Sequence, residues 1–131
     1  MNIVVDTSVI IAVLLNEPIK GSLVEVTSEA TLYAPASLHW EIGNALSAMF
    51  KQKRLSLDQA QKAVRMYKQI VLNLMEVDLG KSIQVSSELA IYAYDAYFIA
   101  CAQKLHAPLL SLDKGLNIAA EKAGIKLLGV K

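Results

Sequence analysis

The sequence predicts an α/β fold with a mostly parallel central sheet of four to five strands. Short apolar runs rich in β-branched residues alternate along the chain with longer segments of helical periodicity, which is typical of parallel α/β proteins. The first run, Ile3-Val4-Val5, has the unbroken apolar character of a strand covered on both faces. We expect a single domain over residues 1–131, because this length suits one hydrophobic core.

The first strand is expected to end at a carboxylate. Asp6 follows the strand directly, and Thr7 or Ser8 can cap a helix over residues 9–15. Ligands of open α/β sheets bind at the carboxyl ends of the strands, where Asp6 would lie. The structural alternative is that Asp6 only caps the next helix.

Turn residues and apolar periodicity divide the middle of the chain into further elements. The clearest helix start is Ser56, which forms a capping-box pattern with Gln59. We expect the buried face of that helix to continue through Val71 and Leu74. In chain order, the predicted elements are a helix over residues 22–28, a strand over 31–34, a helix capped by Ser37 and reaching Lys51, the helix after Ser56, a strand over 75–77 and a helix capped by Asp78.

The last third of the chain continues this alternation. Residues 89–105 are helical by composition, and a break near residues 92–94 would place Asp95 in a first helical turn. The remaining elements are a strand over residues 108–112 that ends at Asp113, a helix over 116–122 stopped by Gly124, and a final strand over 125–130.

Composition limits the partners of this chain. Hydrophobic residues make up 54% of it, which is high for an isolated monomer, so we expect some apolar surface to meet a second copy or a partner. The net charge is +1, so nucleic-acid binding must come from a local patch or from metal ions. Cys101 is the single cysteine, which excludes an intramolecular disulfide.

The sequence does not predict a membrane protein. Its early apolar run is shorter than the ~18 residues that a spanning helix needs. Met1-Asn2 supplies no basic segment, so we expect no signal peptide. The expected compartment is the cytoplasm.

Four acidic residues occur in apolar surroundings, where a charge is costly unless it is compensated. Asp6 and Asp113 follow apolar strands, Glu41 interrupts the apolar stripe of its helix, and Asp95 is flanked by alanines and aromatics. Each has a structural alternative: Asp6 and Asp95 as helix caps, Asp113 as a turn residue before Gly115, and Glu41 as a side chain extending from the edge of the stripe.

The functional interpretation is that the four acids converge on a divalent cation. Mg²⁺ and Mn²⁺ prefer carboxylate oxygens and keep several waters. Such an ion polarises a phosphoryl oxygen and activates a bound water. The reaction indicated is hydrolysis of a phosphodiester bond.

With these residues in hand, the chain resembles the PIN-domain nucleases, and among them the VapC-like toxins of type II toxin–antitoxin pairs. The resemblance covers essentially the whole chain. Its motifs are Val5-Asp6-Thr7-Ser8, the segment from Trp40 to Leu46 around Glu41, the segment from Tyr94 to Ala102 around Asp95, and Leu110-Ser111-Leu112-Asp113. Their order and spacing are more specific than any one motif.

The resemblance implies a PIN-like α/β/α sandwich and a Mg²⁺- or Mn²⁺-dependent endoribonuclease. It also implies a homodimer and a small VapB-like antitoxin that docks in a groove near the site. Asp6, Glu41, Asp95 and Asp113 match the family's catalytic, metal-binding acids. Thr7 or Ser8, and Ser111, match hydroxyl positions with a supporting role. The family often has a further Asp or Asn after the fourth acid; here Lys114 follows, and Asn117 is the nearest such residue.

Several other residues are candidates for contacts with RNA. Asn44 lies one helical turn from Glu41 and could reach substrate or a metal-bound water. Trp40, Tyr94 and Tyr97 could stack on bases, or pack in the core as such aromatics more often do. Lys51, Lys53 and Arg54 form a basic cluster that could bind phosphate, as could Lys114; the alternative is a solvated surface.

Two other functions remain open from the sequence. One is a catalytically silent PIN-like module that binds RNA or protein. The other is a PIN nuclease of RNA processing that has no antitoxin.

Overall fold

The computed structural model describes residues 1–130 and confirms the predicted α/β class. Its four-stranded sheet has the order β3-β2-β1-β4, and every strand pair is parallel. The strands are β1 (Asn2–Val5), β2 (Thr31–Pro35), β3 (Leu72–Met75) and β4 (Leu109–Leu110).

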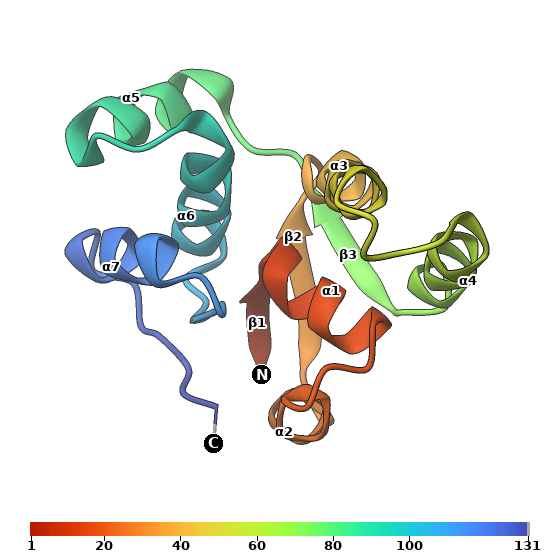
Figure 1. The fold of residues 1–131 in the computed structure, drawn as a ribbon. Coiled ribbons are helices and arrows are strands. Elements are labelled where there is room, and N and C mark those ends of the chain that lie inside the picture. Colours follow the sequence, from red (N-terminus) through yellow and green to blue (C-terminus); the bar gives the residue numbers. More distant parts are fainter. Residues whose placement is uncertain (131) are drawn as a thin grey trace.

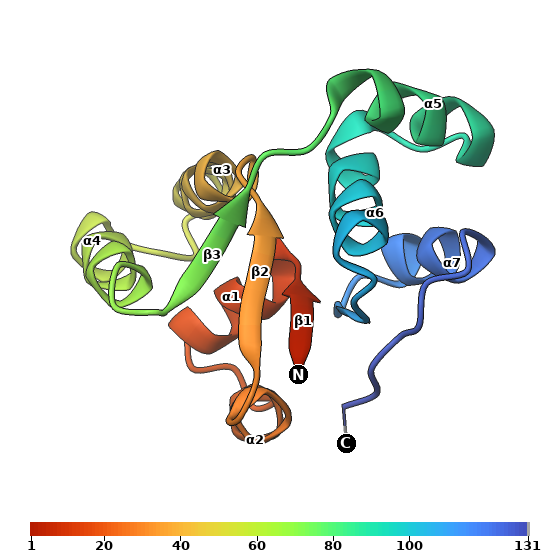
Figure 2. The same cartoon turned by 180° about the vertical axis from the view of Figure 1, so that it is seen from behind.

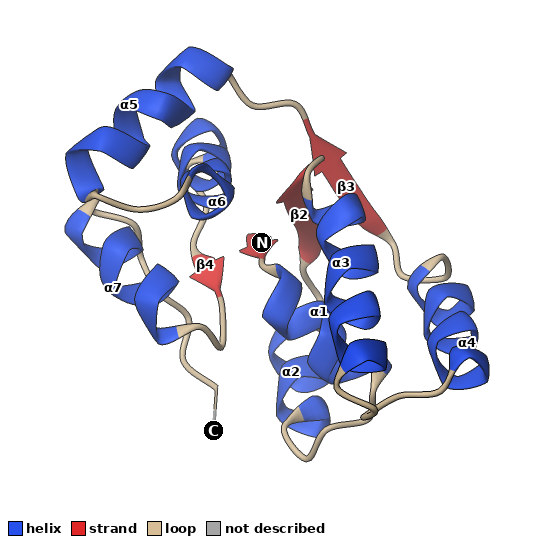
Figure 3. Cartoon of the chain, turned by 45° about the horizontal axis from the view of Figure 1, so that its top comes forward, coloured by secondary structure: helices blue, strands red, loops and turns tan. Residues whose placement is uncertain are grey.

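Helices cover both faces of this sheet, which gives the expected α/β/α sandwich (Figure 3). Helices α1 to α4 gather on one side, where α1 contacts the other three, and α5 to α7 lie on the opposite side, where α6 packs on β1 and β2 (Figure 1). The helices of the described residues are α1 (Thr7–Leu14), α2 (Lys20–Thr27), α3 (Leu38–Lys51), α4 (Leu57–Tyr67), α5 (Leu79–Leu89), α6 (Ala93–Leu105) and α7 (Lys114–Lys122).

The core sits where β1 meets these two layers. Ile3, Val4 and Val5 have no exposed surface, as expected for a strand covered on both faces. Ile99 on α6 and Leu109 on β4 are equally buried. Burial of these side chains holds the carboxyl ends of β1 and β4 side by side.

Helix starts were predicted with mixed success. Asp6 caps α1 by accepting a 3.2 Å hydrogen bond from the backbone N–H of Val9, so neither Thr7 nor Ser8 is the cap. Ser37 occupies the N-cap position of α3, as predicted, but its backbone is helical and its side chain makes no capping hydrogen bond.

Two other helix starts follow the sequence pattern. The Ser56–Gln59 capping box is confirmed, with hydrogen bonds of 3.1 Å from Gln59 N to Ser56 Oγ and 2.9 Å from Ser56 N to Gln59 Oε1. Asp78 caps α5 through a 2.7 Å hydrogen bond from the N–H of Lys81.

The segment after α4 corrects the predicted helical stripe. The helix ends at Tyr67, and β3 begins at Leu72 instead of residue 75. Val71 and Leu74 are 84% and 41% exposed. Their spacing resembles a helical stripe, yet pairing with β2 makes this stretch extended, so that side chains alternate between faces.

The C-terminal third confirms the helix break and corrects the last strand. A left-handed residue, Ala90, follows α5, and α6 begins at Ala93, so Asp95 lies in its first turn as predicted. Gly124 has the positive φ of 80° expected just past α7. Residues 125–130 form no strand, because only Leu127 bridges to Leu109 on the short β4.

Within residues 1–130, no helix has both the length and the apolar character needed to cross a membrane.

Candidate active site

The four predicted acids all lie at helix N-termini. Asp6 and Asp113 cap α1 and α7, which follow the neighbouring strands β1 and β4. Glu41 and Asp95 lie in the first turns of α3 and α6, on opposite sides of the sheet (Figure 3). The positive end of each helix dipole favours a carboxylate at this position.

Asp6 is the most deeply buried of the four acids, with 4% of its surface exposed. The Ser8 hydroxyl donates to its Oδ1 at 2.6 Å, and the Ser111 hydroxyl donates to its Oδ2 at 2.6 Å. These bonds lower its pKa, but loss of solvation on burial outweighs them and raises the pKa above 3.8.

The same two serines tie Asp6 to the loop that carries Asp113. The N–H of Leu112 donates to Ser8 Oγ at 3.0 Å, and the N–H of Asp113 donates to Ser111 Oγ at 3.0 Å. Each hydroxyl therefore bridges one oxygen of Asp6 to one backbone N–H of this loop. This double bridge fixes the position of Asp113 relative to Asp6.

Asp113 is exposed and accepts hydrogen bonds at Oδ1 from the N–H groups of Gly115 and Leu116, at 2.8 and 3.2 Å. Asp113 is therefore the N-cap of α7 rather than the turn residue of the structural alternative. Asp113 also raises the pKa of both Asp6 and Asp95 by charge repulsion, so it belongs to the acidic group as well.

Glu41 is half-buried, and its pKa is raised from 4.5 to about 7. Loss of solvation is the main cause, and the charges of Asp95 and Asp6 add to it. The hydroxyls of Ser37 and Thr7 are near enough to lower this pKa. Neither of them, nor Oε2 of Glu41, has a hydrogen-bond partner of good geometry among the described residues.

Each of the four acids interacts by charge repulsion with two of the others. Asp95 has its pKa raised first by burial and then by Asp113. Asp6 interacts with Asp113 and with Glu41, and Glu41 interacts with Asp95. The structure therefore brings all four charges to one edge of the sheet, although the chain separates them widely.

The chemistry of this group suits a hard divalent ion. Its atoms are carboxylate and hydroxyl oxygens, and one buried carboxylate oxygen of Glu41 lacks a partner. As the side chains stand, no three His, Cys, Asp or Glu residues within 1–130 are close enough together to hold one metal ion. Metal binding by Asp6, Glu41, Asp95 and Asp113 stays a prediction.

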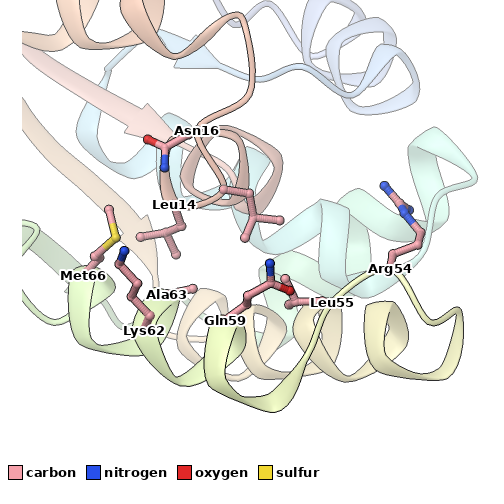
Figure 4. Close-up of a pocket in the computed structure, with 9 residues that line it drawn as sticks. Leu14, Asn16, Arg54, Leu55, Gln59, Lys62, Ala63 and Met66 are labelled. Carbon is pink, nitrogen blue, oxygen red and sulfur yellow. The ribbon is translucent and has the colours of Figure 1, made fainter.

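Most of the predicted basic contacts lie away from these acids. Lys51 ends α3, ten residues and about 15 Å along the helix from Glu41. Lys53 and Arg54 follow it, and Arg54 lines a pocket of about 360 Å³ between α1 and α4 (Figure 4). Lys114, in contrast, is exposed directly after Asp113.

Other polar residues lie closer to the acids. Asn44 is exposed one turn after Glu41, as expected. Asn117 donates from Nδ2 to the Ser111 carbonyl at 3.0 Å, so it supports the loop that carries Asp113. The hydroxyl of Ser37 near Glu41 was missed; its signal was the spacing of four residues, which places both side chains on one helical face.

Fold and site together define a PIN domain. The model of the PIN domain family matches residues 3–122, and the chain belongs to this family. No curated protein sequence matches the chain with significance.

Solved structures of low sequence identity share the fold. PAE2754 from Pyrobaculum aerophilum has a TM-score of 0.71 and 18% identity, over 91% of this chain and 79% of that one. VapBC2 from Rickettsia felis, bound to a DNA fragment from its promoter, has a TM-score of 0.69 and 14% identity over the full length of both chains. VapC20 from Mycobacterium tuberculosis, a toxin that cleaves the sarcin–ricin loop, has a TM-score of 0.63 and 16% identity, over 89% and 94%.

Proposed function

We propose that this PIN domain is a Mg²⁺- or Mn²⁺-dependent endoribonuclease that acts as the toxin of a toxin–antitoxin pair. The observation that carries the proposal is the meeting of Asp6, Glu41, Asp95 and Asp113 at the N-termini of four helices. Burial raises the pKa of Asp6, Glu41 and Asp95, and repulsion among the acids raises it further; a bound cation would offset this repulsion.

In this proposal each acid has a defined task. Asp6, held at both oxygens by Ser8 and Ser111, binds the ion together with Asp95 and Asp113. A divalent ion held there would polarise the scissile phosphate and lower the pKa of the attacking water. Glu41, a half-buried carboxylate of the same group, would act as general base and accept a proton from the attacking water.

The proposed partners follow from the same family membership. Two of the solved structures with this fold are named as VapBC2 and as VapC20, a toxin that cleaves the sarcin–ricin loop. We therefore propose an RNA substrate, a small VapB-like antitoxin, a homodimer and a cytoplasmic location for this chain. Exposed apolar side chains such as Leu79 and Ile83, one turn apart on α5, are consistent with protein partners.

The decisive experiment is cleavage of RNA by the purified chain with and without Mg²⁺ or Mn²⁺. Asp6→Asn and Asp95→Asn should each reduce the rate by a hundredfold or more while circular dichroism shows that the fold is kept. The matched control is Asp78→Asn, because Asp78 caps a helix as Asp6 does but lies outside the acidic group.

Full activity in both site variants would remove the proposed mechanism. Binding of RNA without cleavage at any concentration of either ion would favour the silent module instead. RNA cleavage by the purified chain, together with normal growth of cells that express it, would favour an RNA-processing nuclease.

A further inference from the structure

A cavity of about 340 Å³ lies between the first turn of α5 and the last turns of α6. A short loop joins these two helices, which pack against each other (Figure 2). The cavity volume is within the range of small-molecule sites. The residues that line it are Val77, Asp78, Lys81, Ala100, Gln103 and Lys104, none of which belongs to the acidic group.

Gln103 carries a buried acceptor that has no partner. Its Oε1 atom is shielded from solvent and forms no hydrogen bond within residues 1–130. A buried polar atom without a partner is costly, so each such atom needs an explanation. Gln103 also lines a second cavity, at the ends of α6 and α7, so its side chain lies between two open spaces. A ligand that donates a hydrogen bond to Oε1 would remove the cost.

Two lysines make the rim of the cavity positive. Lys81 and Lys104 both line it, and both are exposed. The Lys104 ammonium donates to the carbonyl oxygen of Glu76 at 3.0 Å, which fixes it beside the connection from β3 to α5, and an ammonium has two further donors. The acid among the lining residues, Asp78, already accepts the N–H of Lys81 at 2.7 Å as the cap of α5. An anionic group is therefore favoured beside the two ammonium groups.

The rest of the wall is apolar, which limits the kind of anion that fits. Val77 and Ala100 contribute this surface, together with the aliphatic stems of the lysines. A phosphate ion alone would meet the lysines but neither the apolar surface nor the carboxamide. The carboxamide of Gln103 has an acceptor beside a donor, the pattern that complements the edge of a nucleobase. A nucleotide combines an anion, a flat ring and such an edge, and so matches every part of the wall.

We propose that this cavity binds a nucleoside monophosphate, with Gln103 at the edge of the base and Lys81 and Lys104 at the phosphate. The nucleotide comes either free or as an unpaired nucleotide of an RNA strand, and both sources present the same chemistry. Gln103 lies eight residues, or about 12 Å, along α6 from Asp95. Binding in the cavity therefore requires no divalent ion and does not depend on the proposed nuclease function.

The test is calorimetric titration of the full chain in a chelator, which removes divalent ions from the acidic group. The probes are adenosine monophosphate, adenosine, inorganic phosphate and a short 2′-O-methyl RNA. We expect adenosine monophosphate to bind more tightly than adenosine or phosphate. Binding of the RNA roughly tenfold tighter than that of the mononucleotide would identify an RNA strand as the source, and equal or weaker binding would identify the free nucleotide.

Three results of this titration would overturn the inference. The first is no binding of either the mononucleotide or the RNA. The second is equal affinity for phosphate and adenosine monophosphate, which would show that the base is not recognised. The third is tighter binding of a glutamate-rich peptide than of the mononucleotide, which would make the cavity a docking site for protein.

Gln103→Met is the sharpest variant, because it keeps the length of the side chain and removes the carboxamide. It should raise the Kd for adenosine monophosphate by roughly tenfold or more. The urea midpoint of the ligand-free protein should stay the same or rise, because the acceptor that is removed has no partner. A lower midpoint with unchanged affinity would show that Gln103 is only structural.

Lysine variants test the contact with phosphate. Lys81→Ala should weaken binding of adenosine monophosphate and leave binding of adenosine nearly unchanged. The matched control is Lys51→Ala, because Lys51 is also exposed but ends α3, which does not line the cavity. Equal affinity of the two variants for the mononucleotide would contradict the assigned role of Lys81.

A last variant separates this inference from the proposed nuclease. Asp6→Asn should bind adenosine monophosphate in the chelator as the unmodified chain does, because Asp6 does not line the cavity. Binding that is lost in Asp6→Asn but kept in Gln103→Met would place the nucleotide at the acids and overturn the inference. Nucleotide binding in a chain that cleaves no RNA would support the cavity and remove the nuclease.

Discussion

The hydroxyl of Ser111 donates a 2.6 Å hydrogen bond to Oδ2 of Asp6, although 105 residues separate the two in the chain. Ser111 follows β4 and Asp6 follows β1, so the bond joins the carboxyl ends of two neighbouring strands. The same hydroxyl accepts a bond from the N–H of Asp113. One serine therefore sets the relative position of two acids of the proposed site.

Ser111→Ala should destabilise the fold as well as reduce activity. The substitution leaves an oxygen of Asp6 and the N–H of Asp113 without this partner at a site that is 7% exposed. We expect the free energy of unfolding to fall by about 1–3 kcal/mol in urea denaturation. Ser47→Ala is the control, because its hydroxyl is exposed and bonds only its own helix; a loss as small as that of the control would contradict the bridging role.

Glu41 should make the metal-free protein less stable as the pH rises. Its folded-state pKa of about 7 lies above the ordinary 4.5, so the folded state binds the proton more tightly than the unfolded state. This contribution is fully present below pH 4.5 and is lost as the pH rises through about 7. Asp6 and Asp95, whose pKa values are also raised, act in the same direction.

The measurement is the midpoint of urea unfolding in a chelator at several pH values. Glu41→Gln should flatten the slope, because glutamine cannot titrate, and should raise stability at neutral pH. Glu25→Gln on the exposed face of α2 serves as the control. A slope that is the same in Glu41→Gln and in the unmodified chain would show that another group is responsible.

Addition of Mg²⁺ should restore the stability that the metal-free protein loses as the pH rises. A divalent ion binds deprotonated carboxylates, so the rise in Tm that it causes should be larger at pH of about 8 than at pH of about 6. Asp6→Asn should abolish the rise, and Asp78→Asn should retain it. An equal rise in both variants would place the ion elsewhere on the surface.

The sequence was informative wherever local chemistry decides the structure. The apolar run before Asp6 predicted a buried strand, because a segment covered on both faces cannot contain polar residues. The Ser56–Gln59 box marked a helix start, since both of its hydrogen bonds form within four residues. Such features need no knowledge of the rest of the chain.

The sequence was misleading where pairing with a distant strand decides the structure. Val71 and Leu74 continue a helical spacing, but β3 exists because it pairs with β2, about forty residues earlier. The apolar tail after Gly124 was predicted as a strand, yet β4 is only two residues long and offers it a single bridge. The local sequence pattern shows neither which strand a segment will pair with nor how long that strand is.

The acidic site shows a third kind of limit. From sequence, a helix cap and a site residue were alternative interpretations of Asp6; in the structure the carboxylate caps α1 and also lies near the other acids, so the two interpretations do not exclude each other. The order of the motifs indicated which acids would meet. The bonds that Ser8 and Ser111 make around Asp6 depend on side-chain orientation across the sheet, which no local pattern specifies.

The placement of all four acids at helix N-termini has a consequence for robustness. The compensating positive potential comes from peptide N–H groups, which do not titrate over the range in which proteins stay folded. No single side-chain exchange removes it, and acetylation of a lysine leaves it intact. Surface lysines and arginines of the chain can therefore be exchanged while the positive electrostatic potential of the helix N-termini at the carboxylates persists.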